Sequence, residues 1–294
     1  MPLAALGDII EPARAAGHGV GAFNVIGIEH AEAIVAGAEA ATAPVVLQIS
    51  ENCVAYHGRL VPIAQACLAL ARTAAVPVAV HLDHAVDVAL VEAAVEAGIG
   101  SVMFDASGLS YQENVRATAS VARFCQRQGI WVEAELGEIG GKDGVHSPLA
   151  RTDPDDAAAF AAATAIDALA IAVGSSHAMA TRDAVLDIGL IARIHHAVSV
   201  PLVLHGSSGV PDRNLVDAVR AGMTKINIAT QLNKVFTAAV RRCLAGDTAL
   251  ADPRRYGAAG RAAVAAEVAR LLQVIGATAG TGGALRGQDG GRHG

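Results

Sequence analysis

The stretch VPVAVHLDHA (residues 76–85) decides the fold, because it joins a buried strand directly to a cluster of polar side chains. Its first five residues are apolar, and His81, Asp83 and His84 follow at once. A near-continuous apolar run is typical of a parallel strand that helices cover. The stretch therefore predicts a buried parallel strand whose carboxyl end carries chemistry.

The same pattern occurs along the whole chain, with helical patterns between the apolar runs. Eight runs read as strands, at residues 21–25, 44–50, 76–83, 101–105, 130–137, 168–175, 201–206 and 225–230. Eight strand–helix units predict a (β/α)8 TIM barrel, here one catalytic domain over residues 1–275 followed by a flexible glycine-rich tail, 276–294. A doubly wound open sheet is the structural alternative, but no GxGxxG motif opens a helix.

Helix boundary signals support this division. Asp153 followed by Pro154 predicts a helix start, and Ser110 with Glu113 has the spacing of a capping box. Gly98 and Gly222 stand where two helices should end.

Composition limits the class of protein. The chain has 294 residues, of which 53% are hydrophobic and 17% charged, as expected of a globular protein. A net charge of -6 and the lack of a basic stripe argue against a nucleic-acid partner. The four cysteines form no CxxC pair, and the sequence has neither a signal peptide nor an apolar membrane span. These features predict a cytoplasmic protein without a membrane partner.

Polar residues recur where the predicted strands end. They are Asn24, Gln48, Ser50, His81 to His84, Asp105, Ser107, Glu133, Glu135, Ser175 to His177, His205 to Gly209, Asn227 and Thr230. The carboxyl ends of barrel strands lie on one face, where the active sites of such barrels are found. The sequence therefore predicts a functional site on that face.

Three histidines are candidate metal ligands. His84, His177 and His205 close strands three, six and seven, and three neutral imidazoles with one open position suit a catalytic divalent ion, most often Zn²⁺. Co²⁺ or Mn²⁺ would accept the same ligands. For each histidine alone, the alternative is a hydrogen bond to a loop carbonyl.

Acidic residues accompany the histidines. Asp83 would exchange a proton with a substrate hydroxyl or orient a histidine. Asp105 and Glu135 would be alternate metal ligands, partners of the histidines or structural carboxylates. Strand alternation places His81 on the side of Asp83 and opposite His84.

Two glycine-rich loops are candidate binding elements. Residues 205–209, HGSSG, follow strand seven, where barrels of this kind bind phosphate, and Asn227 to Thr230 would complete the cradle. Residues 137–144, GEIGGKDG, read as a mobile lid. The alternatives are a plain turn and a long connecting loop.

Together, VAVHLDHA, VEAELG, LVLHGSSG and KINIATQL resemble the class II, metal-dependent ketose-bisphosphate aldolases, which include fructose- and tagatose-bisphosphate aldolases. The resemblance covers nearly the whole chain. It implies metal ligation by His84, His177 and His205, an acid/base role for Asp83 at the C4 hydroxyl, and a second or displaced metal position at Asp105 and Glu135. The NIATQL form is similar to the tagatose-type branch.

The resemblance also implies a substrate site for a phosphosugar. Asn227 would lie over the enediolate, and the pocket and phosphate cradle would comprise Asn24, Ser50, Gly206, Ser207, Ser208, Asn227, Ile228, Ala229 and Thr230. No Schiff-base lysine is needed, and neither Lys142 nor Lys225 looks desolvated. Arg254, Arg255 and Arg261 are candidates for a second phosphate. A homodimer or homotetramer is implied as well.

Three positions depart from the family pattern. Ala178 replaces a glycine beside the phosphate or a monovalent cation, Ser207 replaces a smaller residue, and the lid has Asp143 where relatives carry a catalytic glutamate. The altered lid and Ala178 keep open an aldolase for another ketose phosphate, or a metal-binding paralogue without turnover. A metal-dependent hydrolase would place an HxH pair on strand one, where this chain has Asn24.

Overall fold

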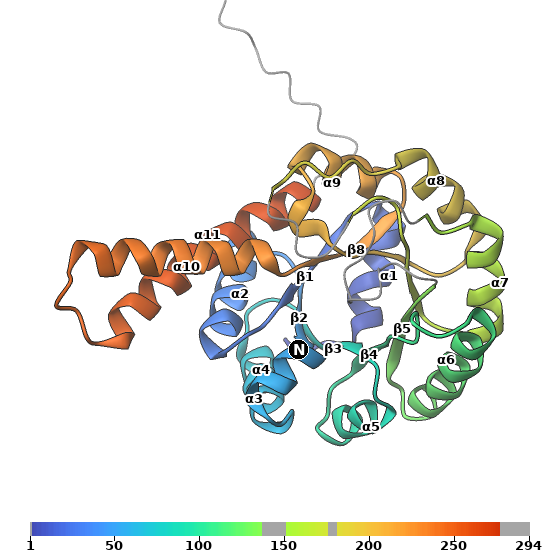
Figure 1. Cartoon of the computed structure of the whole chain (residues 1–294), viewed down its shortest axis with the longest axis horizontal. Coiled ribbons are helices and arrows are strands. Elements are labelled where there is room, and N and C mark those ends of the chain that lie inside the picture. The colour runs from blue at the N-terminus through green and yellow to red at the C-terminus, as the bar shows by residue number, and fades with distance from the viewer. Residues whose placement is uncertain (1, 137–150, 176–180, 277–294) are drawn as a thin grey trace, which may run out of the picture.

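The protein folds as a closed barrel of eight parallel strands in the order β1 to β8 (Figure 1). The computed structural model describes residues 2–136, 151–175 and 181–276. The strands are β1 (Val20–Asn24), β2 (Val45–Ser50), β3 (Val78–Ala85), β4 (Ser101–Phe104), β5 (Trp131–Glu135), β6 (Ala168–Ala170), β7 (Leu202–Leu204) and β8 (Met223–Ile228). The predicted (β/α)8 barrel is confirmed.

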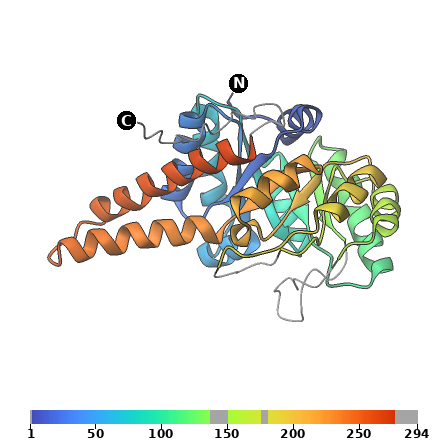
Figure 2. The same ribbon diagram turned by 90° about the horizontal axis from the view of Figure 1, so that it is seen from above.

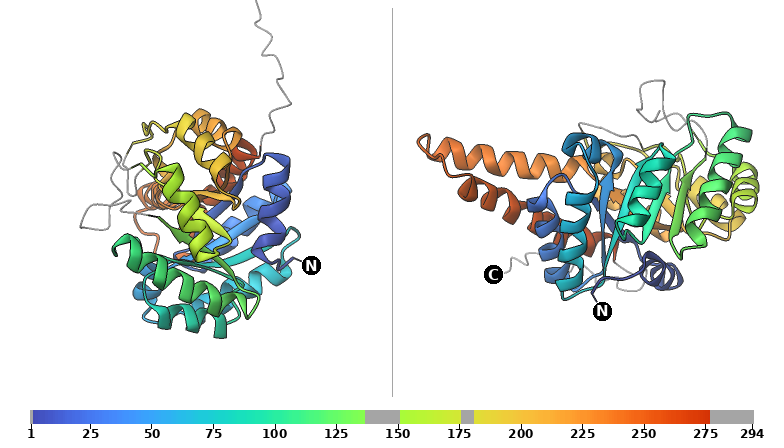
Figure 3. Two further views of the ribbon diagram at one scale, coloured as in Figure 1. Left: turned by 90° about the vertical axis from the view of Figure 1, so that its right-hand side faces the viewer. Right: turned by 90° about the horizontal axis from the view of Figure 1, so that it is seen from below.

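Helices surround the barrel and connect its strands (Figures 1 and 3). They are α1 (Leu6–Ala16), α2 (Ile28–Ala41), α3 (Glu51–His57), α4 (Val61–Thr73), α5 (Val88–Glu96), α6 (Tyr111–Gln126), α7 (Pro154–Thr164), α8 (Ile188–Ala197), α9 (Asp212–Arg220), α10 (Thr230–Gly246) and α11 (Pro253–Ile275), with the short 3-10 helix η1 (Ser207–Gly209) after β7.

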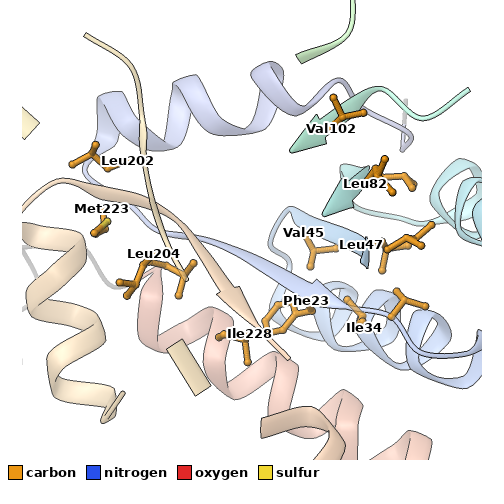
Figure 4. Packing of buried hydrophobic residues seen from close by; sticks show 14 of the residues in the cluster. Phe23, Ile34, Val45, Leu47, Leu82, Val102, Leu202, Leu204, Met223 and Ile228 are labelled. Carbon is orange, nitrogen blue, oxygen red and sulfur yellow. The ribbon is translucent and has the colours of Figure 1, made fainter. Parts of the chain in front are cut away.

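Alternation along each strand separates an outer core from the barrel interior. Outward residues such as Phe23, Leu47, Leu82, Leu204 and Ile228 are fully buried against the helices (Figure 4). Successive side chains of a strand point to opposite faces, so the residues between them face inward. The inward set is where the polar residues lie.

One end of the interior is apolar. Helix α1 places Leu6, Ile9 and Ile10 against the amino-terminal parts of the strands, where Val20, Ala22, Val46 and Ala79 form one buried cluster with them. The aromatic ring of Trp131 packs beside this cluster and leaves no room for a side chain at Gly7. This end of the barrel is closed by packing.

Helices α10 and α11 form a hairpin whose far end projects beyond the barrel (Figures 2 and 3). Its base is anchored by close packing. A Cβ atom at Gly37 of α2 would lie 2.6 Å from the carbonyl oxygen of Ala265, and one at Gly260 would lie 2.5 Å from the Phe236 ring. Glycine is thus needed where the two helices approach their neighbours.

The strand predictions hold in number and order but differ at the ends. Strand six was expected to reach Ser175, yet β6 ends at Ala170, and β8 begins two residues before the predicted Lys225. Both predicted helix starts are confirmed: Asp153 caps α7, and Ser110 with Glu113 forms the capping box of α6.

Within residues 2–136, 151–175 and 181–276, no single helix is long and apolar enough to cross a membrane. Helices α3 and α4, bent by 117° where they meet, pass that test only when taken together. The division into residues 1–275 and a tail stays a prediction, because residues 277–294 lie outside the described part.

Candidate active site

The end of β3 brings Asp83 and His84 to the same side of the strand. Simple alternation places them on opposite faces, but His84 has a left-handed backbone, with φ 51°, and the pairing of β3 with β4 shifts between Leu82 and Ala85. This local irregularity turns the His84 imidazole toward His205, while Asp83 keeps its inward direction. Ligand atoms of the three residues lie within 4.8 Å of one another.

The imidazoles of His84 and His205 face each other through one nitrogen each. His84 Nε2 lies 2.9 Å from His205 Nδ1, and the ring planes are nearly perpendicular, at 84°. The other nitrogen of each ring contacts a carboxylate: His84 Nδ1 is 2.9 Å from Asp105 Oδ2, and His205 Nε2 is 3.0 Å from Glu133 Oε1. Each carboxylate fixes the orientation of one ring.

Electrostatics around His84 favour positive charge. Burial lowers its pKa, but Asp83, the hydrogen bond to Asp105 and the charge of Glu135 outweigh that effect and raise the pKa to about 10. Burial opposes ionisation of Asp105, yet the hydrogen bonds from His84 and Ser107 hold its pKa well below the usual range. A cation at this place would be stabilised by the surrounding carboxylates.

Glu135, at the end of β5, belongs to the same region. It is fully buried, and burial together with the charge of Asp105 raises its pKa well above that of a free carboxyl group. His84, Asp105 and Glu135 form a second group whose ligand atoms lie within 4.8 Å of one another. The two acids predicted as alternate metal ligands are therefore close to one of the histidines.

Amide side chains from β1 and β8 contact Asp83 across the barrel mouth. Asn24 donates to Asp83 Oδ2 over 3.0 Å and accepts from Gln48 over 3.1 Å, while Asn227 Nδ2 lies 3.5 Å from Asp83 Oδ1. Asn227 Oδ1 is buried, and no described residue is a hydrogen-bond partner for it. Gln48 had no assigned role in the sequence, although its position at a strand end was the available signal.

The loop after β7 meets the start of α10. Ser208 Oγ accepts hydrogen bonds from the backbone N–H groups of Ala229 and Gln231, both over 3.2 Å. Gly206 adopts a left-handed backbone with φ 68°, and the hydroxyl of Ser207 donates to the carbonyl of Leu204 instead of facing α10. The loop thus lies against a helix N-terminus, a place that favours anions.

The remaining residues of the predicted pocket lie at the ends of β2 and β8 and at the start of α10. Asn227 and Ile228 end β8, and Ala229 and Thr230 begin α10. Ser50 pairs with Asp83 in the sheet register, and its hydroxyl accepts from the Cys53 N–H as the cap of α3.

The expectation that Lys225 is not desolvated is wrong. Its side chain is only 1% exposed, and its Nζ lies 2.8 Å from Glu133 Oε2 inside the barrel. The prediction failed because Lys225 was taken as the start of a strand, whereas β8 begins at Met223 and carries the residue inward.

Several predicted residues lie outside the described part of the chain: His177, Ala178, Lys142 and Asp143. The three arginines considered for a second phosphate each form an ion pair on the α10–α11 hairpin or its base. Arg254 pairs with Asp252, Arg255 with Asp247, and Arg261 with Glu32.

The described donors fit a divalent cation. With a cation bound, and with Asp105 and Glu133 each accepting a hydrogen bond from one ring, the facing nitrogens of His84 and His205 would present their lone pairs to it. Two imidazole lone pairs and a nearby Asp83 oxygen form a nitrogen-and-oxygen donor set that suits zinc, cobalt or manganese. The identity of the metal is not fixed by such a set.

Known proteins are similar to this chain over nearly its whole length. A fructose-bisphosphate aldolase of Geobacillus stearothermophilus is 36% identical over 282 residues, covering 95% of this chain and 98% of that protein. The crystal structure of the YdjI aldolase from Escherichia coli K12 superposes with a TM-score of 0.83 at 30% identity, covering 94% of this chain and 98% of that chain.

A fructose-bisphosphate aldolase from Campylobacter jejuni, at 22% identity, shares the fold, with a TM-score of 0.78 and coverage of 92% and 93% of the two chains. The family model described as fructose-bisphosphate aldolase class-II matches residues 4–280, which include every described residue of the site. The chain therefore belongs to the class-II fructose-bisphosphate aldolase family and is an aldolase, a carbon–carbon lyase.

Proposed function

We propose that this aldolase is zinc-dependent and reversibly cleaves a ketose 1,6-bisphosphate, of fructose or tagatose, into dihydroxyacetone phosphate and glyceraldehyde 3-phosphate. The observation that carries the proposal is the facing pair His84 Nε2 and His205 Nδ1, with an Asp83 oxygen beside them. His177 would be the third ligand, as the resemblance implies. A divalent cation there supplies Lewis-acid chemistry at the ketose carbonyl.

Asp83 is proposed to move the proton of the C4 hydroxyl. Its carboxylate lies at the barrel mouth next to His84, and the amides of Asn24 and Asn227 direct its oxygens. A carboxylate held in this way accepts the hydroxyl proton as the C3–C4 bond breaks and returns it in the synthetic direction. The buried Oδ1 of Asn227 would accept a hydrogen bond from a substrate hydroxyl.

The start of α10 is proposed to bind the phosphate of dihydroxyacetone phosphate. Backbone N–H groups at Ala229 and beyond open this 17-residue helix, and the Ser208 hydroxyl lies against them. A phosphate is favoured at such a terminus by the helix dipole, and the Ser208 hydroxyl, which accepts from the Ala229 and Gln231 N–H groups, can donate its own hydrogen to it. Ser207, a departure from the family pattern, turns its hydroxyl toward Leu204 and so leaves the cradle unobstructed.

Five finer points stay predictions. They are zinc as the native metal, Asp143 as the acid of the lid, a monovalent cation near Ala178, a homodimer or homotetramer, and a cytoplasmic location. Metal analysis of the purified protein tests the first, and light scattering tests the oligomeric state.

Coupled cleavage assays test the proposed function. Fructose and tagatose 1,6-bisphosphate are supplied in turn, and release of dihydroxyacetone phosphate is followed with and without EDTA, beside a His84→Ala variant. Release that EDTA and the variant both abolish supports the proposal, and the ratio between the sugars assigns the branch. Metal-replete protein that cleaves neither sugar would contradict it and point to another ketose phosphate.

A further inference from the structure

A buried ion pair lies directly beneath the metal-binding histidines. Glu133 of β5 and Lys225 of β8 are 0% and 1% exposed, and Lys225 Nζ lies 2.8 Å from Glu133 Oε2. The other oxygen, Oε1, lies 3.0 Å from His205 Nε2. One carboxylate therefore joins an ammonium group to an imidazole inside the barrel.

Geometry makes Glu133 a hydrogen-bond acceptor at both oxygens. A lysine ammonium can only donate, so Oε2 accepts from Lys225 over 2.8 Å, and Oε1 is left to accept from His205. His81 does not supply a proton to this carboxylate. The Ser101 hydroxyl donates to Val80, so it accepts from His81 Nδ1, and His81 Nε2 is left 3.8 Å from Oε2 without a hydrogen bond among the described residues.

His205 must be the donor in its hydrogen bond with Glu133 Oε1. An Oε1 that accepts at 3.0 Å requires Nε2–H on that ring, and Nδ1 is then the lone-pair nitrogen that faces His84. The amide nitrogen of Asn227, 3.2 Å from the same Nε2, cannot donate to a protonated nitrogen, so its hydrogens are left for Asp83. The pair thus decides which nitrogen of His205 is a ligand.

We propose that Glu133 and Lys225 are a positioning pair that selects the Nδ1-ligating tautomer of His205. The inference rests on the proposed metal-dependent function and adds to it two residues that lie deeper in the barrel. Lys225 acts only through Glu133: its ammonium group, paired and 1% exposed, is held away from any substrate.

Substituting Glu133 by Gln tests this directly. Glutamine has nearly the same shape but one oxygen and one NH2 group. Because Lys225 can only donate, it takes the amide oxygen, and the NH2 group then faces His205 Nε2. That contact favours the proton on Nδ1, the wrong tautomer, so we expect metal affinity to fall roughly 10- to 100-fold.

The double variant Glu133→Gln/Lys225→Met distinguishes the proposal from a purely structural role of the pair, because the two predict opposite changes in metal affinity. Without the ammonium group, the glutamine turns its oxygen toward Nε2–H, and most of the metal affinity should return. If the two substitutions merely damaged the core, their losses of metal affinity would add. Ser101→Ala is the matched control, because this buried hydroxyl contacts His81 but neither Glu133 nor His205.

Zinc and cobalt affinities are measured by chelator competition, with circular dichroism of the metal-free proteins to show that each is folded. Loss in the single variant and recovery in the double one supports the proposal. Unchanged affinity in Glu133→Gln, or a double variant that binds no more tightly than the single one, overturns it.

The wild-type protein gives a second readout that does not depend on substituting Glu133 or Lys225. Histidine ¹⁵N spectra of the zinc-loaded protein, with His205 assigned by substitution, should show the proton on Nε2, and a proton on Nδ1 overturns the proposal. Neither measurement depends on sugar cleavage. A metal site that behaves as expected in a protein that cleaves neither sugar would contradict the proposed function alone.

Discussion

The two ends of the barrel interior are built from the same strands but are stabilised in different ways. On β5, Trp131 packs at the apolar end, whereas Glu133 and Glu135 lie further along the same strand and are fully buried. At the apolar end each residue is stabilised by contact alone. At the polar end Asp83, Glu133 and Lys225 each have a hydrogen-bond partner from another strand or strand end, because an unpaired buried polar group is costly. One end supports the fold, and the other supports the chemistry.

The strongest test of this division is Asp83→Asn. The variant keeps the shape of the side chain but removes the group proposed to move the proton, so kcat should fall roughly 10²- to 10⁴-fold while the protein stays folded. Steady-state cleavage assays measure the loss. Asp87→Asn, at the cap of α5 in the loop after the same strand, is the control and should leave kcat unchanged. An Asp83→Asn enzyme with normal kcat would remove Asp83 from the mechanism.

The converse substitution, Ile10→Ala, acts at the apolar end. Ile10 is 2% exposed in the cluster that closes the barrel, so its truncation should lower the free energy of unfolding by about 2–5 kcal/mol. Urea denaturation gives the change, and kcat of the folded enzyme at low temperature should equal that of the wild type. Ile28→Ala, at a residue that is 47% exposed, should have a much smaller effect. A selective loss of kcat in Ile10→Ala would show that the two ends are not independent.

Ser208→Ala sharpens the comparison at a residue where stability and binding meet. The variant removes the hydroxyl that accepts from two N–H groups at the start of α10, which should lower the free energy of unfolding by about 1 kcal/mol. It also removes a hydrogen-bond donor for the phosphate, so KM should rise about tenfold. Ser207→Ala is the matched control, since that hydroxyl contacts only the Leu204 carbonyl among the described residues. Equal KM values for the two variants would exclude Ser208 from phosphate binding.

The smallest effect is expected away from both ends. Asp153 caps α7 by accepting from the N–H groups of Asp155 and Asp156, so Asp153→Ala should cost about 1 kcal/mol of unfolding free energy without changing kcat or KM. Thermal unfolding followed by circular dichroism checks the first part. Asp155→Ala, which removes no cap, is the comparison, and an equal loss there would rule out capping as the cause.

The sequence predicted the barrel well because its signals are local. Apolar runs such as the one before His81 and boundary pairs such as Asp153 and Pro154 depend only on neighbouring residues. The strand ends were less accurate, as β6 shows by stopping at Ala170, because hydrophobicity alone does not reveal where sheet hydrogen bonds stop.

The site was predicted in its residues but not in its contacts. Alternation placed His84 opposite Asp83, and only the left-handed backbone at His84, with the shifted pairing of β3 and β4, brings them together. Lys225 looked like a strand start, and its burial against Glu133 depends on where β8 begins in the sheet.

The sequence by itself determined which residues reach the mouth of the barrel, since the order of strands and the period of two along each strand are written in the chain. Only the tertiary structure decided which of those residues touch. Contacts such as His84 with His205 and Glu133 with Lys225 join residues 121 and 92 positions apart. Their geometry is set by the closure and register of the sheet, which no local pattern encodes.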